Sequence, residues 1–140
     1  MADYLSKATL LELLGIVNAT EKLPAQAALD FLAPTIPSAS LQQLDGSRMV
    51  KQYVDGSGVA ESPFAVNLRI KPDDSDARAD AAGALMELAD ALESLAELPV
   101  GWRSLRGVST PTKIEANEDG SEVWRATFLL ESDRGARASS

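Results

Sequence analysis

The stretch PFAVNLRIKPDDSDARADAAGALMELADALESLAEL, residues 63–98, carries the two strongest patterns of this sequence side by side. In its first part apolar residues alternate with small or polar ones, the period of a strand with one buried face. In its second part an apolar stripe recurs every three or four positions, as in an amphipathic helix, at Ala81, Leu85, Leu88, Leu92 and Leu95. Asp74 or Ser75 is expected to cap this helix and Pro99 to end it. We therefore predict a strand that leads into a main helix over residues 75–98.

Further patterns lie on either side of this stretch. Apolar residues at helical spacing predict a helix over residues 7–19, with Ser6 as its N-cap. Asp45-Gly46, a pair typical of two-residue turns, predicts a hairpin between the strands that flank it. Two more strands are expected around a turn at residues 117–121, which contains another Asp-Gly pair. Pro63 is expected at the start of its strand or at a bulge, because proline cannot donate to a sheet.

The order of these elements predicts the fold class. Strands grouped before and after one long helix are typical of α+β domains. We expect a mostly antiparallel sheet of about four to six strands, with the long amphipathic helix and the shorter N-terminal helix packed on one face. A chain of 140 residues fits one domain, which we place at residues 1–132, with a flexible tail at 133–140. No internal repeat is visible in the sequence.

The sequence contains no cysteine and no histidine. This excludes disulfides, thiolate nucleophiles, and both the commonest metal ligand and the usual general base near neutral pH. The Gly-Ser-Gly run at 56–58 lacks the Lys-Ser/Thr ending of a phosphate-binding loop. The aspartates within residues 73–76 are not followed by the glycine and glutamate of a calcium loop. We therefore expect no cofactor, no metal site and no enzymatic activity.

The formal net charge is −8, and most of it lies in the predicted main helix. The segment from Lys71 to Leu98 contains eight acidic residues and only two basic ones, Lys71 and Arg78. Such a surface disfavours tight binding of nucleic acid, whose phosphates require basic residues. A solvated helix face explains the same charges without any partner. The sequence has neither an apolar run that spans a membrane nor a signal-peptide pattern, so we expect a soluble protein.

Two segments of the chain carry turn and strand motifs whose order matches that of a known family. YVDGSGVAESPFAVNLRI, residues 53–70, holds an aromatic-x-Asp-Gly-Ser turn and a Pro-Phe-Ala strand. STPTKIEANEDGSEVWRATFLL, residues 109–130, holds Thr-Pro before a turn and Glu-Asp-Gly-Ser-Glu before the last strand. Together with the long helix between them, these segments resemble a family of tailed-bacteriophage neck proteins, the minor capsid proteins similar to tail terminators. The likeness covers residues 48–130, and the proline-containing N-terminal third departs from it.

The resemblance implies a structural role in a virion. Tail terminators form a ring, commonly of six subunits, at the head-proximal end of the tail tube. The ring stops tube polymerisation and offers the surface to which the head connector docks. The implied partners are further copies of this chain, the tail-tube protein, and a connector, adaptor or stopper protein of the head. DNA would pass through the ring without tight binding, and the protein would be assembled in the host cytoplasm and act in the virion, with no membrane involved.

Candidate contact residues lie in or near the two turns of these motifs. They are Tyr53, Asp55, Gly56, Ser57, Glu61, Glu118, Asp119 and Gly120. Loops carry recognition while a sheet holds them in place, although solvent-exposed turns without a partner explain the same residues. On the main helix, Asp80, Asp90 and Glu93 form a candidate acidic face toward the lumen of a ring, where they would repel phosphates and let DNA slide.

Alternative interpretations fit the sequence as well. One is another neck component, such as a stopper or head-completion protein between portal and tail. Another is an acidic DNA mimic that inhibits a nucleic-acid-binding protein. Against it, the acidic residues concentrate on one helix that also needs an apolar stripe for packing, and salt-sensitive binding to a basic enzyme would support it. An enzyme that works on carboxylates alone comes last, and a strongly raised carboxylate pKa would be its first support.

Overall fold

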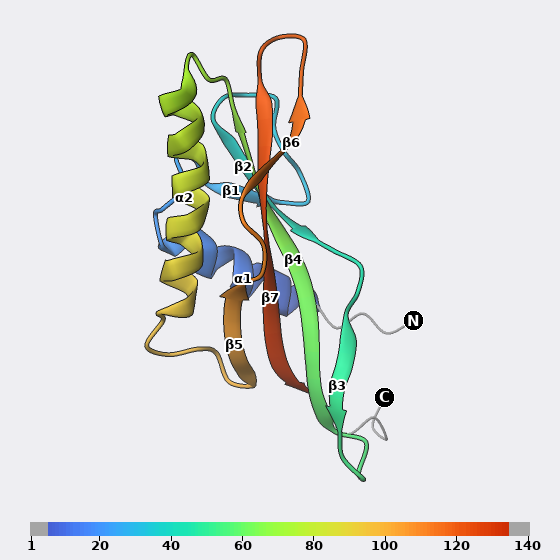
Figure 1. The fold of residues 1–140 in the computed structure, drawn as a ribbon. Helices are drawn as coiled ribbons and strands as arrows, with labels where there is room; N and C mark the ends of the chain where they lie inside the picture. The colour runs from blue at the N-terminus through green and yellow to red at the C-terminus, as the bar shows by residue number, and fades with distance from the viewer. Residues whose placement is uncertain (1–5, 135–140) are drawn as a thin grey trace.

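Two long antiparallel strands, β4 (Gly58–Ile70) and β7 (Glu122–Arg134), run through the centre of the molecule (Figure 1). The structure is a computed structural model, which describes residues 6–134. The other elements, in chain order, are α1 (Lys7–Ala19), β1 (Ala27–Leu29), β2 (Ser38–Gln43), β3 (Arg48–Gln52), α2 (Ser75–Glu93), β5 (Trp102–Gly107) and β6 (Thr112–Ala116).

Short strands flank the central pair on both sides. β2 and β3 pair with β4, and β5 and β6 pair with β7, all antiparallel. β1 extends the sheet by pairing in parallel with β2. It forms in the proline-containing segment between α1 and β2, where the Asn18 side chain bonds both backbone groups of Ala27, at 2.7 and 3.2 Å. The seven-stranded sheet confirms the α+β class, with one strand more than expected.

Both helices pack on one face of the sheet, as predicted. Ser6 and Asp74 cap them by accepting hydrogen bonds from backbone N–H groups. At the centre of the core, the rings of Phe64 and Phe128 stack with centroids 5.4 Å apart and planes inclined by 14°. The helices contribute the buried side chains of Leu10, Leu13, Val17, Leu85, Leu88 and Leu92.

The sheet contains an internal repeat. β2, β3 and β4 contain 6, 5 and 13 residues, and β5, β6 and β7 contain the same numbers in the same order. The offset in the numbering is constant, so that Ser38 corresponds to Trp102 at the first strand of each set and Gly58 to Glu122 at the last. Residues 38–70 and 102–134 therefore form two β units of equal length.

The connections between the strands of the two units are equivalent too. In the first unit, the N–H of Leu44 donates to the carbonyl of Pro63 at 3.2 Å. At the corresponding positions of the second unit, the N–H of Val108 donates to the carbonyl of Thr127 at 2.9 Å. A β-bulge interrupts β3 and β6 at the same place. The equivalence thus extends from strand lengths to individual hydrogen bonds.

Because β4 and β7 are antiparallel, an approximate two-fold axis relates the two units. It passes between Phe64 and Phe128, which are equivalent in the repeat and directly opposite in the strand register. Few positions of the two units are identical, namely Ser40/Ser104, Leu41/Leu105, Asp55/Asp119, Gly56/Gly120, Ser57/Ser121, Val59/Val123 and Phe64/Phe128. The expectation of no internal repeat was therefore wrong. The two units share strand lengths and hydrogen bonds but few identical residues, so the repeat is hard to see in the sequence.

The hairpin predicted at Asp45-Gly46 was also wrong. β2 and β3 lie one after the other along the same side of β4, and residues 44–47 bridge them. The true hairpin joins β3 to β4. Pro63 lies within β4, not at its start, and its carbonyl accepts from Leu44 in this bridge. Since both backbone groups of a strand residue face the same side, the missing N–H of Pro63 also faces the bridge, where no strand needs it.

Two predicted boundaries need correction. α2 ends at Glu93 and not at residue 98, because Ser94 leaves helical geometry and the chain turns toward β5. Leu95 and Leu98 still pack against the core from the connection, which is why their spacing imitated a longer helix. β7 continues to Arg134, so the first two residues of the expected tail belong to the sheet. Residues 135–140 of that expected tail lie outside the described residues.

Candidate functional site

The turn between β3 and β4 is closed by its own polar groups. The N–H of Tyr53 donates to the carbonyl of Ser57 at 2.7 Å, and the N–H of Gly56 donates back to the carbonyl of Tyr53 at 3.0 Å. Asp55 Oδ1 accepts from the Ser57 N–H at 2.9 Å and from its hydroxyl at 2.5 Å. These bonds, the hydroxyl first, lower the pKa of the Asp55 carboxyl because they stabilise its ionised form. Gly56 has a φ of 89°, a conformation that glycine adopts at little cost.

The turn between β6 and β7 repeats this arrangement. Asn117 and Ser121 close it with a 2.8 Å hydrogen bond, and Gly120 has a φ of 90°. Asp119 Oδ1 accepts from the Ser121 N–H at 2.9 Å and from its hydroxyl at 2.7 Å. The pKa of Asp119 is lowered by the same bonds, with smaller contributions from the nearby charges of Lys71 and Arg69. The structure thus brings the candidate contact residues, apart from Glu61, into two equivalent turns.

The two turns lie at opposite ends of the molecule. The first unit places its turn beside Gly58 and the second beside Glu122, and these residues are at the two ends of the β4–β7 ladder. Figure 1 shows one turn below the sheet and the other above it. Strands of 13 residues rise about 3.3 Å per residue, so the turns are about 40 Å apart. They cannot form one site within a subunit.

Their exposed side chains differ in chemistry although their backbones agree. In the β3–β4 turn Tyr53 is 44% exposed and Val54 is fully exposed. The Nζ of Lys51 lies 5.4 Å from the centre of the Tyr53 ring. In the β6–β7 turn the positions equivalent to Tyr53 and Val54 hold Asn117 and Glu118. One turn therefore ends in apolar side chains and the other in polar and acidic ones.

Glu61 does not belong to the turn with which the sequence grouped it. It lies within β4, since the strand begins at Gly58. Its side chain is 16% exposed and bonds Arg48 at 3.2 Å and Arg106 at 3.7 Å. These ion pairs join β3, β4 and β5, so we assign Glu61 to the sheet and not to a contact surface.

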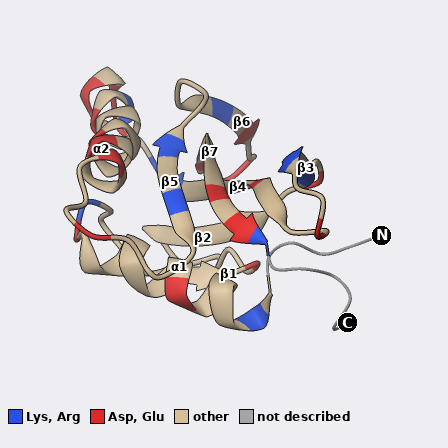
Figure 2. Cartoon of the chain, turned by 90° about the horizontal axis from the view of Figure 1, so that it is seen from below, with Lys and Arg blue, Asp and Glu red and all other residues tan. Residues whose placement is uncertain are grey.

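The three acidic residues of the candidate lumen face do not form one face. At about 100° per residue, Asp80 and Glu93 point roughly 140° apart around α2. Glu93 accepts a hydrogen bond from the N–H of Gly107 at 2.9 Å and so ties α2 to the edge of β5. Asp80 and Asp90 are exposed. Figure 2 shows the acidic residues along α2 and basic residues on β5 and β3.

A groove of about 350 Å³ lies between α2 and the segment that joins β5 to β6. Its floor includes the buried Leu85, Ala126 and Phe128. Its sides include Met86 and Val108, which are 53% and 46% exposed. Asp90 and Glu93 also line it. The groove thus has an apolar floor and an acidic side.

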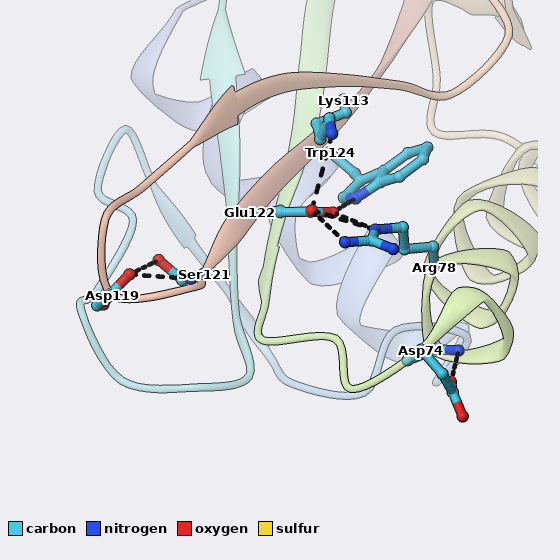
Figure 3. Close-up of polar contacts among 8 residues, drawn as sticks. Asp74, Arg78, Lys113, Asp119, Ser121, Glu122 and Trp124 are labelled. Atoms are coloured by element: carbon cyan, nitrogen blue, oxygen red, sulfur yellow. Dashed lines mark hydrogen bonds and ion pairs between the residues drawn. The ribbon is translucent and has the colours of Figure 1, made fainter.

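A second polar cluster fixes the start of α2 to the sheet (Figure 3). Glu122 accepts hydrogen bonds from Arg78 at 3.0 to 3.1 Å and from the Trp124 indole at 3.2 Å, and Lys113 Nζ lies 3.7 Å from it. The Glu122 side chain is 7% exposed. Its pKa is lowered, chiefly by the Arg78 hydrogen bonds, and the pKa of Arg78 is raised by the same contact. Two cations compensate the nearly buried carboxylate of Glu122 and join α2, β6 and β7, so we interpret the cluster as structural.

Over residues 6–134, no group of three or more acidic side chains is placed to hold a metal ion. No helix in the same range is long and apolar enough to cross a membrane.

Comparisons with known proteins give a structural likeness but no sequence match. No protein-family model matches this chain, and no curated protein matches it. Among solved structures, a chain from the virion of a native gene transfer agent (GTA) particle has a similar fold, with a TM-score of 0.54 over 84% of each chain. The two sequences are 14% identical. This chain therefore shares its fold with a chain of a virion.

Of the residues that distinguish the two turns, sequence reasoning named Tyr53 and Glu118 but missed Val54 and Asn117. Val54 stands next to the Asp-Gly-Ser motif, and an apolar residue at the end of a turn was the signal that it would be exposed. The groove beside α2 left no signal, because it is formed by segments that are separate in the chain. The Arg78–Glu122 contact joins residues 44 positions apart and left none either.

Proposed function

We propose that this protein is a structural component of the neck of a tailed bacteriophage or a related particle. In this role it forms a ring that caps the tail tube, ends its polymerisation and provides the surface that joins head and tail. The observation that carries the proposal is the fold, which matches that of a virion chain over 84% of both lengths. The motifs at residues 53–70 and 109–130, which resemble tail terminators, support it independently.

The arrangement of the two turns fits a subunit that lies between two different partners. Each turn is closed by Asp-Ser and backbone hydrogen bonds, so it presents its outer residues in a fixed geometry. The turns point in opposite directions along the β4–β7 axis (Figure 1). In a ring of such subunits the two turns would meet different partners, and a neighbouring copy of the chain can be one of them. The acidic residues along α2 suit a surface past which DNA slides without binding.

Fewer residues suit the acidic lumen face than the sequence indicated. Asp80 is exposed on α2, whereas Glu93 accepts a hydrogen bond from the N–H of Gly107 and Asp90 lines the groove beside α2. We assign the phosphate-repelling role to Asp80 alone. An acidic DNA mimic needs its carboxylates spaced along one surface, and the spread of acids around α2 does not favour that function.

The proposed function is tested with particles that lack the protein. Without a terminator, tail tubes should vary in length and should not join to filled heads, and supplying the wild-type chain should restore both uniform length and joining. Electron microscopy of tails and heads gives the readout. Tubes of normal length that remain unjoined would instead identify a stopper or head-completion protein. Normal, joined particles without the chain would overturn a structural role in the neck.

A further inference from the structure

We propose that the β3–β4 turn of one copy docks into the groove between α2 and residues 107–111 of the next copy. The occupant of the groove is therefore a second copy of this chain. This inference rests on the ring proposed above and deepens it, because it names the two surfaces that meet at each subunit boundary.

The inserted surface is the apolar end of the turn. Val54 is fully exposed and Tyr53 is 44% exposed. The turn on which both lie is held by the Asp55–Ser57 hydrogen bonds. An apolar side chain in a preorganised turn loses little conformational entropy when it docks. The burial of Val54 and Tyr53 would also remove an apolar surface from water, which favours association.

The receiving surface is the groove beside α2, which has an apolar floor and an acidic side. The floor of the groove is made by Leu85, Ala126 and Phe128, and its volume of about 350 Å³ is that of a small binding pocket. Met86 and Val108 stand partly exposed at its sides. These two side chains would cover an inserted apolar residue and exclude water around it, as the surroundings of an interface hot spot do.

Charge complementarity identifies the occupant as this turn. Lys51 lies over the Tyr53 ring, so a positive charge accompanies the apolar end. Asp90 and Glu93 line the groove. Figure 2 shows basic residues on β3 and acidic residues on α2, on opposite sides of the molecule. When Val54 enters the groove, Lys51 would approach Asp90 at the rim of the interface, where charges set orientation and specificity.

The repeat provides an internal comparison for this choice. The β6–β7 turn has the same backbone, but Glu115, Asn117 and Glu118 stand at the positions of the basic and apolar residues. Its insertion into the groove would bring like charges together and bury a carboxylate. The groove therefore accepts one of two turns of equal shape, which leaves the β6–β7 turn for a partner of another kind.

The positions of the two surfaces fit a head-to-tail contact. β3 pairs with the side of β4 that faces away from β7, whereas β5 and β6 lie beyond β7. The turn and the groove are thus on opposite edges of the sheet. A contact between different surfaces of identical subunits can repeat around a closed ring, which a contact between identical patches cannot do beyond a dimer.

Disulfide trapping tests the contact, because the chain has no cysteine of its own. Val54→Cys and Met86→Cys are made in separate chains, one of which carries a size tag, and the mixed proteins are oxidised. We expect tagged–untagged heterodimers to form at least several-fold faster than with Glu118→Cys in place of Val54→Cys. That control places the thiol on the equivalent position of the other turn. Heterodimer yields equal to the control would overturn the docking.

Charge reversal provides a second test that needs no further cross-link site. In mixtures of the same cysteine chains, Lys51→Glu or Asp90→Lys alone should lower the trapping rate, and the two together should restore it at least in part. If neither substitution changes the trapping rate, the assignment of the turn to the groove is overturned. The ring itself is tested separately by the tail-length experiment. Uniform tails with failed trapping would reject this interface alone, whereas unaffected particles without the chain would reject the proposed function.

Discussion

Phe64 and Phe128 occupy equivalent positions of the two β units and stack on each other at the two-fold axis that relates them. Each ring is fully buried, and each unit therefore fills the centre of the core of the other. The centre of the sheet is thus a contact between two repeats and not a feature of either repeat alone. A single unit would leave open the backbone edge of its long strand, which the other unit pairs, so the two units complete one sheet.

Replacing either phenylalanine should therefore cost similar amounts of stability. We expect Phe64→Ala and Phe128→Ala each to lower the free energy of unfolding by about 3–5 kcal/mol, because each leaves a cavity at the same place. The double variant should lose less than the sum of both, since the stacking interaction is counted in each single variant. Denaturant unfolding gives the three values. Phe31→Ala, at a side chain 60% exposed, is the control that should change little. A strongly unequal pair would contradict the equivalence.

The sequence predicted most of the helices and strands, but it predicted less well how the strands are connected. The stripe on α2, the alternation in β4 and the two Asp-Gly-Ser turns gave correct elements because each is a local pattern. Asp45-Gly46 carried the same local pattern but does not close a hairpin, because β2 and β3 both find their hydrogen-bond partner in β4. The repeat and the groove depend on contacts between distant segments, and no local pattern encodes them.

The repeat provides a comparison for a buried hydroxyl that has no partner among the described residues. Ser62 Oγ is fully buried and bonds no group among the described residues. The equivalent position of the second unit holds Ala126, which is also buried. We expect Ser62→Ala to raise the free energy of unfolding by about 1 kcal/mol, since it removes an unpaired polar group. Ala126→Ser is the matched control and should lower stability. Thermal unfolding compares both, and a loss of stability in Ser62→Ala would show that the hydroxyl is needed.

Replacing two different glycines with alanine should change the free energy of unfolding in opposite directions. A Cβ at Gly58 would lie 2.0 Å from the carbonyl oxygen of Lys51, so Gly58→Ala must displace the backbone of β3. We expect it to lower the free energy of unfolding by about 2 kcal/mol or more. Gly83 lies inside α2 with no atom within 4 Å of an added Cβ. Gly83→Ala should raise stability by about 0.5–1 kcal/mol, because alanine favours the helix. Chemical denaturation of both variants checks the signs, and a stable Gly58→Ala would contradict the close approach.

The two Asp-Ser turns predict a shared response to acid. The pKa values of Asp55 and Asp119 are lowered by bonds from Ser57 and Ser121, so each carboxyl stabilises the fold above its unfolded pKa. That stabilisation is lost as the pH falls through the lowered folded pKa, below about pH 4. Ser57→Ala should raise the pKa of Asp55 alone, and Ser121→Ala that of Asp119 alone.

Carboxyl NMR titrations of the wild type and the two serine variants measure these shifts residue by residue. Lys71→Ala is the matched control, because Lys71 contributes to the lowered pKa of Asp119 and not to that of Asp55. It should therefore raise the first value slightly and leave the second unchanged. If neither serine variant moves its neighbouring carboxyl, the hydroxyl bonds do not hold the turns, and the rigidity on which both recognition ends depend would have to come from the backbone bonds alone.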